Sequence, residues 1–214
     1  MNKYLYLTLL FFVSFNTLAT NPDPTIHYFV EGRVQAPWEL SLEYGQRPID
    51  EEGKASTVRN SLSLEAIENE AGTDVVKLTW KPKGIKNEWG AINESILTAT
   101  MTNTQRWIDL SNIKDQAALA VDIRVIAPPK ELVEWTLESE WNWQERASFP
   151  LKNVLKRLPK KKWVTIPIPL KCFDNSNLNF EKITSIMQLK TAGKMTIELG
   201  DIRLAAAPPN SSCG

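Results

Sequence analysis

The sequence has few of the residues that most often carry enzyme chemistry. It contains one histidine, His27, and two cysteines in 214 residues. A Ser-His-Asp triad would need His27, which lies in a loose segment without the sharp nucleophile-bearing turn of such enzymes. The chain also lacks a glycine-rich phosphate loop, a dinucleotide-binding fingerprint and the Cys and His spacing of a zinc site. These absences favour a binding protein, and the many acidic residues keep a glycoside hydrolase as an alternative.

The chain also lacks an excess of charge of either sign. Its 25 Lys and Arg residues balance 25 Asp and Glu residues. This balance gives no electrostatic basis for binding nucleic acid or an anionic membrane. A basic run at 156–162 precedes a predicted strand, and we interpret it as a solvated rim. We therefore expect no nucleic-acid partner.

One long apolar run is present, close to the first residue. Residues 4–15 follow Lys3 without a charge, and small residues flank Leu18. This pattern is typical of a secretory signal peptide, and the run is short for a bilayer span of about 20 residues. An uncleaved anchor is the alternative. We expect removal of 1–19, which leaves a periplasmic or secreted protein without a membrane span, with one domain over 20–204 and a C-terminal tail over 205–214.

Cys172 and Cys213 both lie in the part that we expect to be exported. An even number of cysteines in an oxidising compartment favours a disulfide bond, and two free thiols are the alternative. A bond between them would tie the C-terminal tail to the turn that follows a predicted strand.

Apolar and polar residues alternate with a period of two along most of the chain. Such alternation predicts strands with one buried face, separated here by turns rich in Gly, Pro or Asx residues. The segments that show it are 61–66, 76–80, 119–126, 133–138, 164–169, 186–189, 195–199 and 202–204. The one predicted helix lies near 150–158, where apolar residues recur at helical spacing before Pro159. The pattern predicts an all-β protein, a β-sandwich or jelly roll.

Tryptophan is the unusually frequent residue, with eight copies. Indole faces pack against the C–H face of a pyranose ring, so exposed tryptophans are candidates for sugar contacts. Trp80, Trp135 and Trp163 lie among aliphatic residues that we expect to be buried, and we place them in the core. The remaining candidates lie in polar surroundings, where packing under a loop is the alternative. The predicted carbohydrate contacts are Trp89, Trp141, Asn142, Trp143, Gln144 and Arg146.

The C-terminal half resembles a known family. Trp163 to Phe173, the segment 180–194 and Leu199 to Leu204 resemble the ExoP galactose-binding-like domain, which is the C-terminal module of certain bacterial family-three glycoside hydrolases. The likeness covers roughly 30–204. It implies a jelly-roll β-sandwich of the galactose-binding-like type and a role in processing glucan or oligosaccharide. It does not imply catalysis, because the catalytic residues of such enzymes belong to preceding barrel domains. The segment 140–158 departs from the family, which has a shorter, often cysteine-containing stretch there.

Asp201 and Arg203 are polar residues of the last predicted strand. Asp201 either forms an ion pair that fixes this strand or joins a structural calcium site, as in many jelly-roll modules, and we expect no other cofactor. Three functions stay open. The first is a stand-alone carbohydrate-binding module, the second a scaffold that docks on a separately encoded glycoside hydrolase or transporter, and the third a hydrolase that acts alone.

Overall fold

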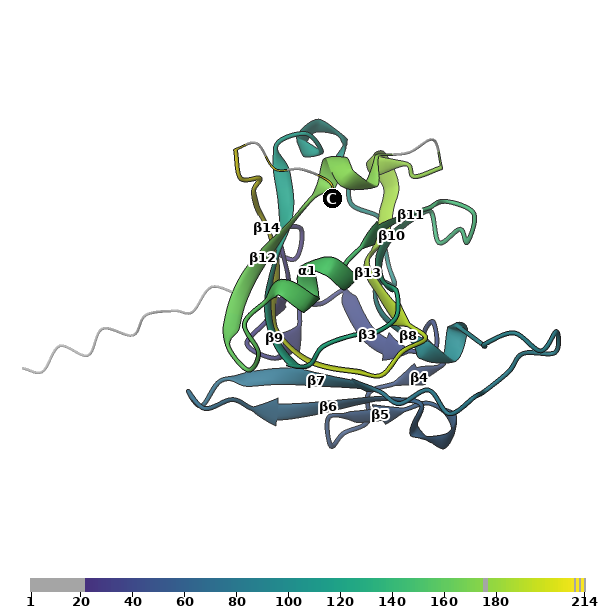
Figure 1. Ribbon diagram of the computed structural model, residues 1–214. Coiled ribbons are helices and arrows are strands. Elements are labelled where there is room, and N and C mark those ends of the chain that lie inside the picture. Colours follow the sequence, from purple (N-terminus) through teal and green to yellow (C-terminus); the bar gives the residue numbers. More distant parts are fainter. Residues whose placement is uncertain (1–21, 175–176, 210, 212, 214) are drawn as a thin grey trace, which may run out of the picture.

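The computed structural model describes residues 22–174, 177–209, 211 and 213. Two antiparallel sheets pack face to face, with β12, β9 and β14 on one side of Figure 1 and β10, β11 and β13 on the other. This arrangement confirms the predicted β-sandwich. The predicted signal peptide lies outside the described residues. Within the described ranges, no helix has the length and hydrophobicity to cross a bilayer.

The first sheet, sheet A, contains eight strands, and the second, sheet B, contains six. The order in sheet A is β12 (Trp163–Pro169), β9 (Ala117–Ala127), β14 (Met195–Ala206), β7 (Asp74–Trp80), β6 (Leu62–Glu68) and β5 (Lys54–Ser56), with β1 (His27–Val30) beside β14 and β2 (Arg33–Val34) beside β1. The order in sheet B is β11 (Arg146–Pro150), β10 (Val133–Ser139), β13 (Ile183–Thr191), β8 (Thr98–Asn103), β3 (Trp38–Leu42) and β4 (Arg47–Pro48).

The core lies between the two sheets and is built by the alternation seen in the sequence. On β9, for example, Leu119, Val121 and Ile123 are fully buried, while Asp122 and Arg124 point outward and are partly exposed. Burying apolar surface in this way contributes roughly 25 cal/mol per Å² removed from water, the dominant stabilising contribution to a fold of this kind.

Two of the three tryptophans predicted to be in the core are there. Trp80 and Trp135 are buried, and each indole N–H finds a backbone carbonyl, that of Leu97 at 2.8 Å and that of Ile186 at 2.9 Å. These bonds satisfy the one polar group of each ring, so the large side chains can be buried without an unpaired donor.

The core prediction for Trp163 is wrong. On β12 the side chains of Ile166 and Ile168 enter the core, so Trp163 and Thr165 point away from it on the opposite face. Trp163 is half-buried on the outside of sheet A, where the guanidinium of Arg124 lies 5.5 Å from the centre of its ring.

The predicted helix is present as α1 (Lys152–Arg157), which links β11 to β12. Leu151 and Leu155 are buried beneath it, and Pro159 follows its end, as the spacing predicts. Single 3₁₀ turns complete the structure: η1 (Val58–Asn60), η2 (Ser95–Leu97), η3 (Ser111–Ile113), η4 (Leu170–Phe173) and η5 (Phe180–Lys182).

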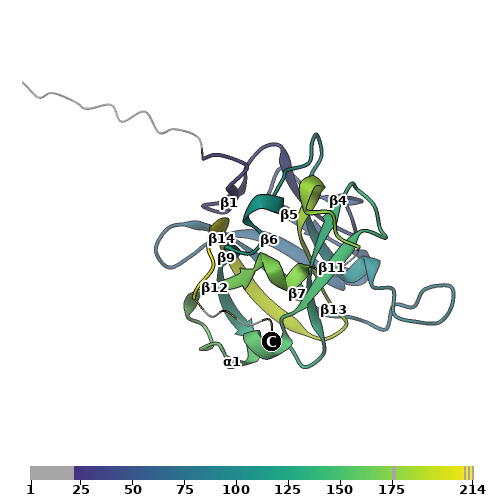
Figure 2. The same cartoon turned by 90° about the horizontal axis from the view of Figure 1, so that it is seen from above.

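A disulfide bond joins Cys172 in η4 to Cys213, confirming that part of the prediction. β14 continues to Ala206, so the first two residues of the predicted tail belong to the last strand. Figures 1 and 2 both show the loop between β7 and η2, residues 81–94, extending away from the body of the sandwich.

Candidate functional site

The outer face of sheet B carries a hollow of about 260 Å³, here called the sheet-B groove. Its floor is a row of polar side chains from neighbouring strands, because strand register places them opposite one another. Ser41 pairs with Thr100, Thr100 with Gln188, and Gln188 with Thr136. The hydroxyl of Thr100 is buried beneath this row and has no hydrogen-bond partner among the described residues. The floor of the groove is thus polar.

A second row, one pair further along the strands, carries charge. Glu39 of β3 lies opposite Thr102 of β8. On the other side of β13, Glu138 of β10 lies opposite Arg146 of β11. The Glu138 carboxylate is buried and accepts a hydrogen bond from Arg146 Nε at 2.5 Å and another from Gln188 Nε2 at 3.1 Å. Glu39 accepts a bond from Thr104 Oγ1 at 3.3 Å. Both carboxylates that line the groove are therefore engaged by protein groups.

An aromatic cluster stands at one end of the groove, around Arg146. The Arg146 guanidinium carbon lies 3.8 Å from the centre of the Trp143 ring and 4.9 Å from that of Tyr44. The two rings meet edge to face at 5.6 Å. Cation–π contact and the ion pair with Glu138 hold the guanidinium from two sides. The other surface of Trp143 is open, and 64% of the residue is exposed.

Trp141 forms another wall of the groove. Its indole N–H donates to the carbonyl of Asn103 at 2.9 Å, and its ring meets Trp107 edge to face at 6.0 Å. Because the indole N–H is already bonded, Trp141 can offer a ligand only the surface of its ring. The residue is 45% exposed.

Tyr44 and Trp141 both stand on strained backbone. Glu43 and Tyr44 have φ of 56° and 52°, and Glu140 and Trp141 have φ of 54° and 52°. Turns with two consecutive residues in this left-handed region normally use Asn and Gly, because a bulky side chain there is unfavourable by about 1–3 kcal/mol. Strain of this kind gathers at ligand sites, and here it coincides with two aromatic residues of one groove.

The loop that carries Trp141 is fixed by an ion pair on its outer side. Lys182 Nζ lies 2.8 Å from Glu140 Oε1, and the ammonium is 5.5 Å from the Trp107 ring centre. The hydrogen bond from Lys182 lowers the pKa of Glu140, and the bond to Glu140 raises the pKa of Lys182. Both shifts favour the charged pair at neutral pH, which supports the position of the two tryptophans.

The structure brings together only some of the predicted contacts. Trp141 and Arg146 line the groove and Trp143 packs on Arg146, whereas Asn142 and Gln144 line a separate hollow on the other side of their loop. The Asn142 side chain bonds to Glu145 and to the backbone N–H of Gln144. Asn142 and Gln144 therefore shape the loop, and a sugar contact by either of them stays a prediction.

Trp89 lies apart from the groove lining, in the projecting loop 81–94. It is 88% exposed, and its backbone N–H donates to Asn87 Oδ1 at 3.0 Å in a tight turn. Figure 1 shows this loop and the loop between β10 and β11 projecting on the sheet B side of the sandwich. A sugar contact by Trp89 also stays a prediction.

Sequence analysis missed much of the groove. Ser41 and Tyr44, Thr100, and Gln188 come from three separate segments that only the strand pairing brings together. Glu138 falls on the polar face of its strand, which suggests a solvated residue, yet it is buried against Arg146. Glu138 and Arg146 have opposite charge and lie on either side of the turn between β10 and β11, which was a signal for their pairing.

Asp201 is engaged by protein groups. Its Oδ1 accepts the backbone N–H of Glu31 at 3.0 Å, and its Oδ2 lies 3.9 Å from Arg203 Nη1. In the part of the chain that the structure describes, no group of three or more His, Cys, Asp or Glu side chains is placed to hold a metal ion. A structural calcium ion at Asp201 stays a prediction.

The two sheets and the polar groove with its aromatic wall define a β-sandwich domain of the galactose-binding-like type. The chain belongs to the ExoP C-terminal family, described as galactose-binding domain-like, whose model matches residues 36–204. No curated protein matches the chain.

Solved structures share the fold. The exo-1,3/1,4-β-glucanase ExoP from a Pseudoalteromonas species superposes with a TM-score of 0.58 and 16% identity over 89% of this chain, which spans only 21% of that enzyme. The extra C-terminal domain of the same glucanase, solved alone, gives a TM-score of 0.56 and 15% identity, and the match covers 87% of this chain and 95% of that domain.

Two carbohydrate-binding modules are also similar in structure. A family 30 module gives a TM-score of 0.55 and 14% identity, over 88% of this chain and 91% of the module. The family 11 module from Clostridium thermocellum, solved with a β-1,3-1,4-mixed-linked tetrasaccharide, gives 0.50 and 14%, over 85% of this chain and 96% of the module. At such low identity these likenesses show the fold.

Proposed function

We propose that this protein is a non-catalytic carbohydrate-binding module that takes a glucan or oligosaccharide in the sheet-B groove. The observation that carries the proposal is the combination of a polar floor, built from Ser41, Thr100 and Gln188, and the exposed rings of Trp141 and Trp143 beside it. A pyranose ring presents hydroxyls at its rim and C–H groups on its faces, so it can satisfy both kinds of surface at once.

The relatives support this class of ligand. One neighbour is the extra domain of a β-glucanase, and another was solved with a mixed-linked β-glucan tetrasaccharide. Both groove carboxylates, Glu39 and Glu138, are engaged by Thr104 and Arg146, which favours a binding role over paired acid and nucleophile chemistry.

The test is calorimetric titration with a mixed-linked β-glucan tetrasaccharide. We expect saturable binding and a loss of affinity of about 30-fold in Trp141→Ala and in Trp143→Ala, since truncating a central aromatic contact typically costs about 2 kcal/mol. Leu132→Ala is the control, because it truncates an exposed apolar side chain that lies outside both the groove lining and the predicted contacts, and we expect its affinity to stay within about twofold. Wild-type affinity in both groove variants would rule the groove out.

Tyr44 offers a separate test of the strained turn. Tyr44→Gly relieves a left-handed backbone conformation and loses ring contacts with Arg146 and Trp143. Because both contributions are about 1 kcal/mol, we expect the free energy of unfolding to change by less than about 1 kcal/mol while glucan affinity falls. Denaturant unfolding and titration of the same variant check the two halves. A large loss of stability would show that Tyr44 is needed for the fold.

A docking role on a separately encoded glycoside hydrolase is the second candidate. Trp89 and Ile92 are 88% and 47% exposed on the projecting loop, and aromatic and aliphatic side chains on a protruding loop suit a protein interface. Stable co-purification with such a hydrolase that is lost in Trp89→Ala, from a protein without measurable glucan affinity, would favour this role.

Export to the periplasm or the cell exterior fits the disulfide bond, since such bonds persist in oxidising compartments. We propose cleavage after residue 19. Sequencing the N-terminus of the exported protein tests this, and a retained Met1 would refute it.

A further inference from the structure

A hollow of about 460 Å³ lies on the outer face of sheet A and is here called the sheet-A cavity. It forms where β14 changes partners. β7 pairs with β14 as far as Leu199 and β1 pairs with it from Ile202, and the register of β14 against β9 shifts between these two residues. Irregular strand pairing of this kind re-aims side chains, and here it opens a space over Gly200 and Asp201.

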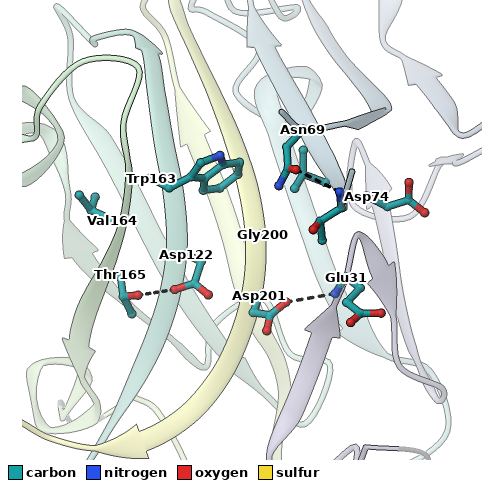
Figure 3. A pocket seen from close by; sticks show the side chains of 11 residues that line it. Glu31, Asn69, Asp74, Asp122, Trp163, Val164, Thr165, Gly200 and Asp201 are labelled. Atoms are coloured by element: carbon teal, nitrogen blue, oxygen red, sulfur yellow. Dashed lines mark hydrogen bonds between the residues drawn. The ribbon is translucent and has the colours of Figure 1, made fainter. Parts of the chain in front are cut away.

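Gly200 and Trp163 shape the cavity. A Cβ atom on Gly200 would lie 3.4 Å from Trp163 Cζ3 and 3.3 Å from Asp122 Cβ, so the missing side chain lets the indole lie close against β14. Figure 3 shows the Trp163 ring beside the strand at Gly200, with Asn69 and Asp74 beyond it. Arg124 holds the ring from its neighbouring position on β9. The cavity therefore has a fixed aromatic surface of sugar-ring size.

The polar groups around this ring are also fixed. Asp122 accepts bonds from the Thr165 hydroxyl and, at 2.9 Å, from Arg203 Nη1. Asp201 accepts the backbone N–H of Glu31, as the dashed line in Figure 3 marks. Because each carboxylate has two oxygens with several acceptor positions, these bonds orient Asp122 and Asp201 and leave capacity for a further donor.

The cavity carries an excess of negative charge. Four carboxylates line it, those of Glu31, Asp74, Asp122 and Asp201, and among the described residues no Lys or Arg side chain is part of the lining. The cations nearby only partly compensate. Arg203 lies beside Asp122 and Asp201, and Arg33 is 3.7 Å from Asp74 with most of its side chain in solvent. Arg124 lies against the Trp163 ring but is itself paired with Glu198 and Glu70. The ligand that fits is rich in donors, carries positive charge and has a flat apolar face.

We propose that the sheet-A cavity is a second ligand site, which binds an amino-sugar residue of a deacetylated glycan. The C–H face of the pyranose would stack on Trp163, and the protonated amine would lie between the ring and the carboxylates of Asp122 and Asp201. An ammonium gains from both, since the indole face attracts cations and charge-assisted hydrogen bonds are about twice as strong as neutral ones. The site lies on the opposite sheet from the groove and does not depend on glucan binding there.

The experiment is a titration with the trisaccharide of β-1,4-linked glucosamine, followed by calorimetry and by the indole signals in NMR spectra. We expect saturable binding that shifts the Trp163 indole resonance. Trp163→Ala should weaken it at least tenfold, and Asp201→Asn about fivefold, because asparagine keeps the acceptor oxygen for Glu31 and removes the charge. Thermal unfolding checks whether both variants are folded. If Trp163→Ala is not folded, the binding of Asp201→Asn decides the question.

Four controls, two variants and two other ligands, separate this site from general attraction. Trp141→Ala, in the groove, and Glu65→Gln, an exposed charge elsewhere on sheet A, should bind the amino sugar as wild type does. The fully N-acetylated trisaccharide, which lacks the charge, should bind at least tenfold more weakly. Trilysine should bind weakly and without dependence on Trp163. Equal binding of the acetylated sugar, or unchanged affinity in both Trp163→Ala and Asp201→Asn, would overturn the proposal.

Discussion

Replacing Arg146 with methionine should lower the free energy of unfolding by about 3 kcal/mol. The substitution leaves the Glu138 carboxylate buried with Gln188 as its remaining side-chain donor, and a buried charge without its partner is strongly unfavourable. It also removes the cation that packs on Trp143 and Tyr44. Denaturant unfolding of the purified variant measures the loss.

The double variant Arg146→Met/Glu138→Gln distinguishes a charge effect from a packing effect. It removes both charges, so at least half of the lost stability should return. Arg47→Met is the matched control, because Arg47 pairs with Glu43 on the same sheet but has 55% of its side chain exposed, and exposed pairs contribute at most about 1 kcal/mol. A loss below about 1 kcal/mol in Arg146→Met would mean that water replaces the guanidinium at little cost.

Removing the disulfide bond should lower the free energy of unfolding by about 3 kcal/mol. The bond joins residues 41 positions apart and so restricts the unfolded chain over the whole of β13 and β14. Cys213→Ser is the cleaner variant, because Cys213 is exposed, whereas Cys172 packs against the core. Urea unfolding with and without reductant gives the comparison.

The reductant supplies the control for this second prediction. Reduced wild type and Cys213→Ser should agree, and Cys172→Ser should be somewhat less stable because it also places a hydroxyl against apolar neighbours. If Cys213→Ser unfolds at the same urea concentration as oxidised wild type, residual structure already restricts the unfolded chain as much as the disulfide bond does.

The strands and the core could be predicted from the sequence because burial of one face imposes a local period of two. Leu119, Val121 and Ile123 alternate with Asp122 and Arg124, and they lie in the core as that pattern predicts. The same rule, applied strictly, places Trp163 in phase with Thr165 and thus outside. The core prediction is wrong because it gave Trp163 the phase of its buried aliphatic neighbours, whereas an odd number of positions separates Trp163 from Ile166 and Ile168.

The groove could be predicted only where it is local in sequence. Trp141, Trp143 and Arg146 lie within six residues of one another, and one loop brings them together. Ser41, Thr100 and Gln188 look like ordinary polar residues of three strands, and only the long-range register aligns them. Tyr44 gave no signal, since its place depends on a turn conformation that its residue type disfavours.

The two sheets pack face to face around a continuous buried core, and the groove and the sheet-A cavity lie on their two outer faces. The two hollows therefore open in opposite directions. A rigid body with two outward-facing sites can hold two polysaccharide chains at once, and neither occupant should alter the affinity for the other. With both proposed sites occupied, the protein would act as a cross-linker: mixed with a polymer of each kind, it should raise viscosity or form a precipitate at concentrations where each polymer alone stays fluid.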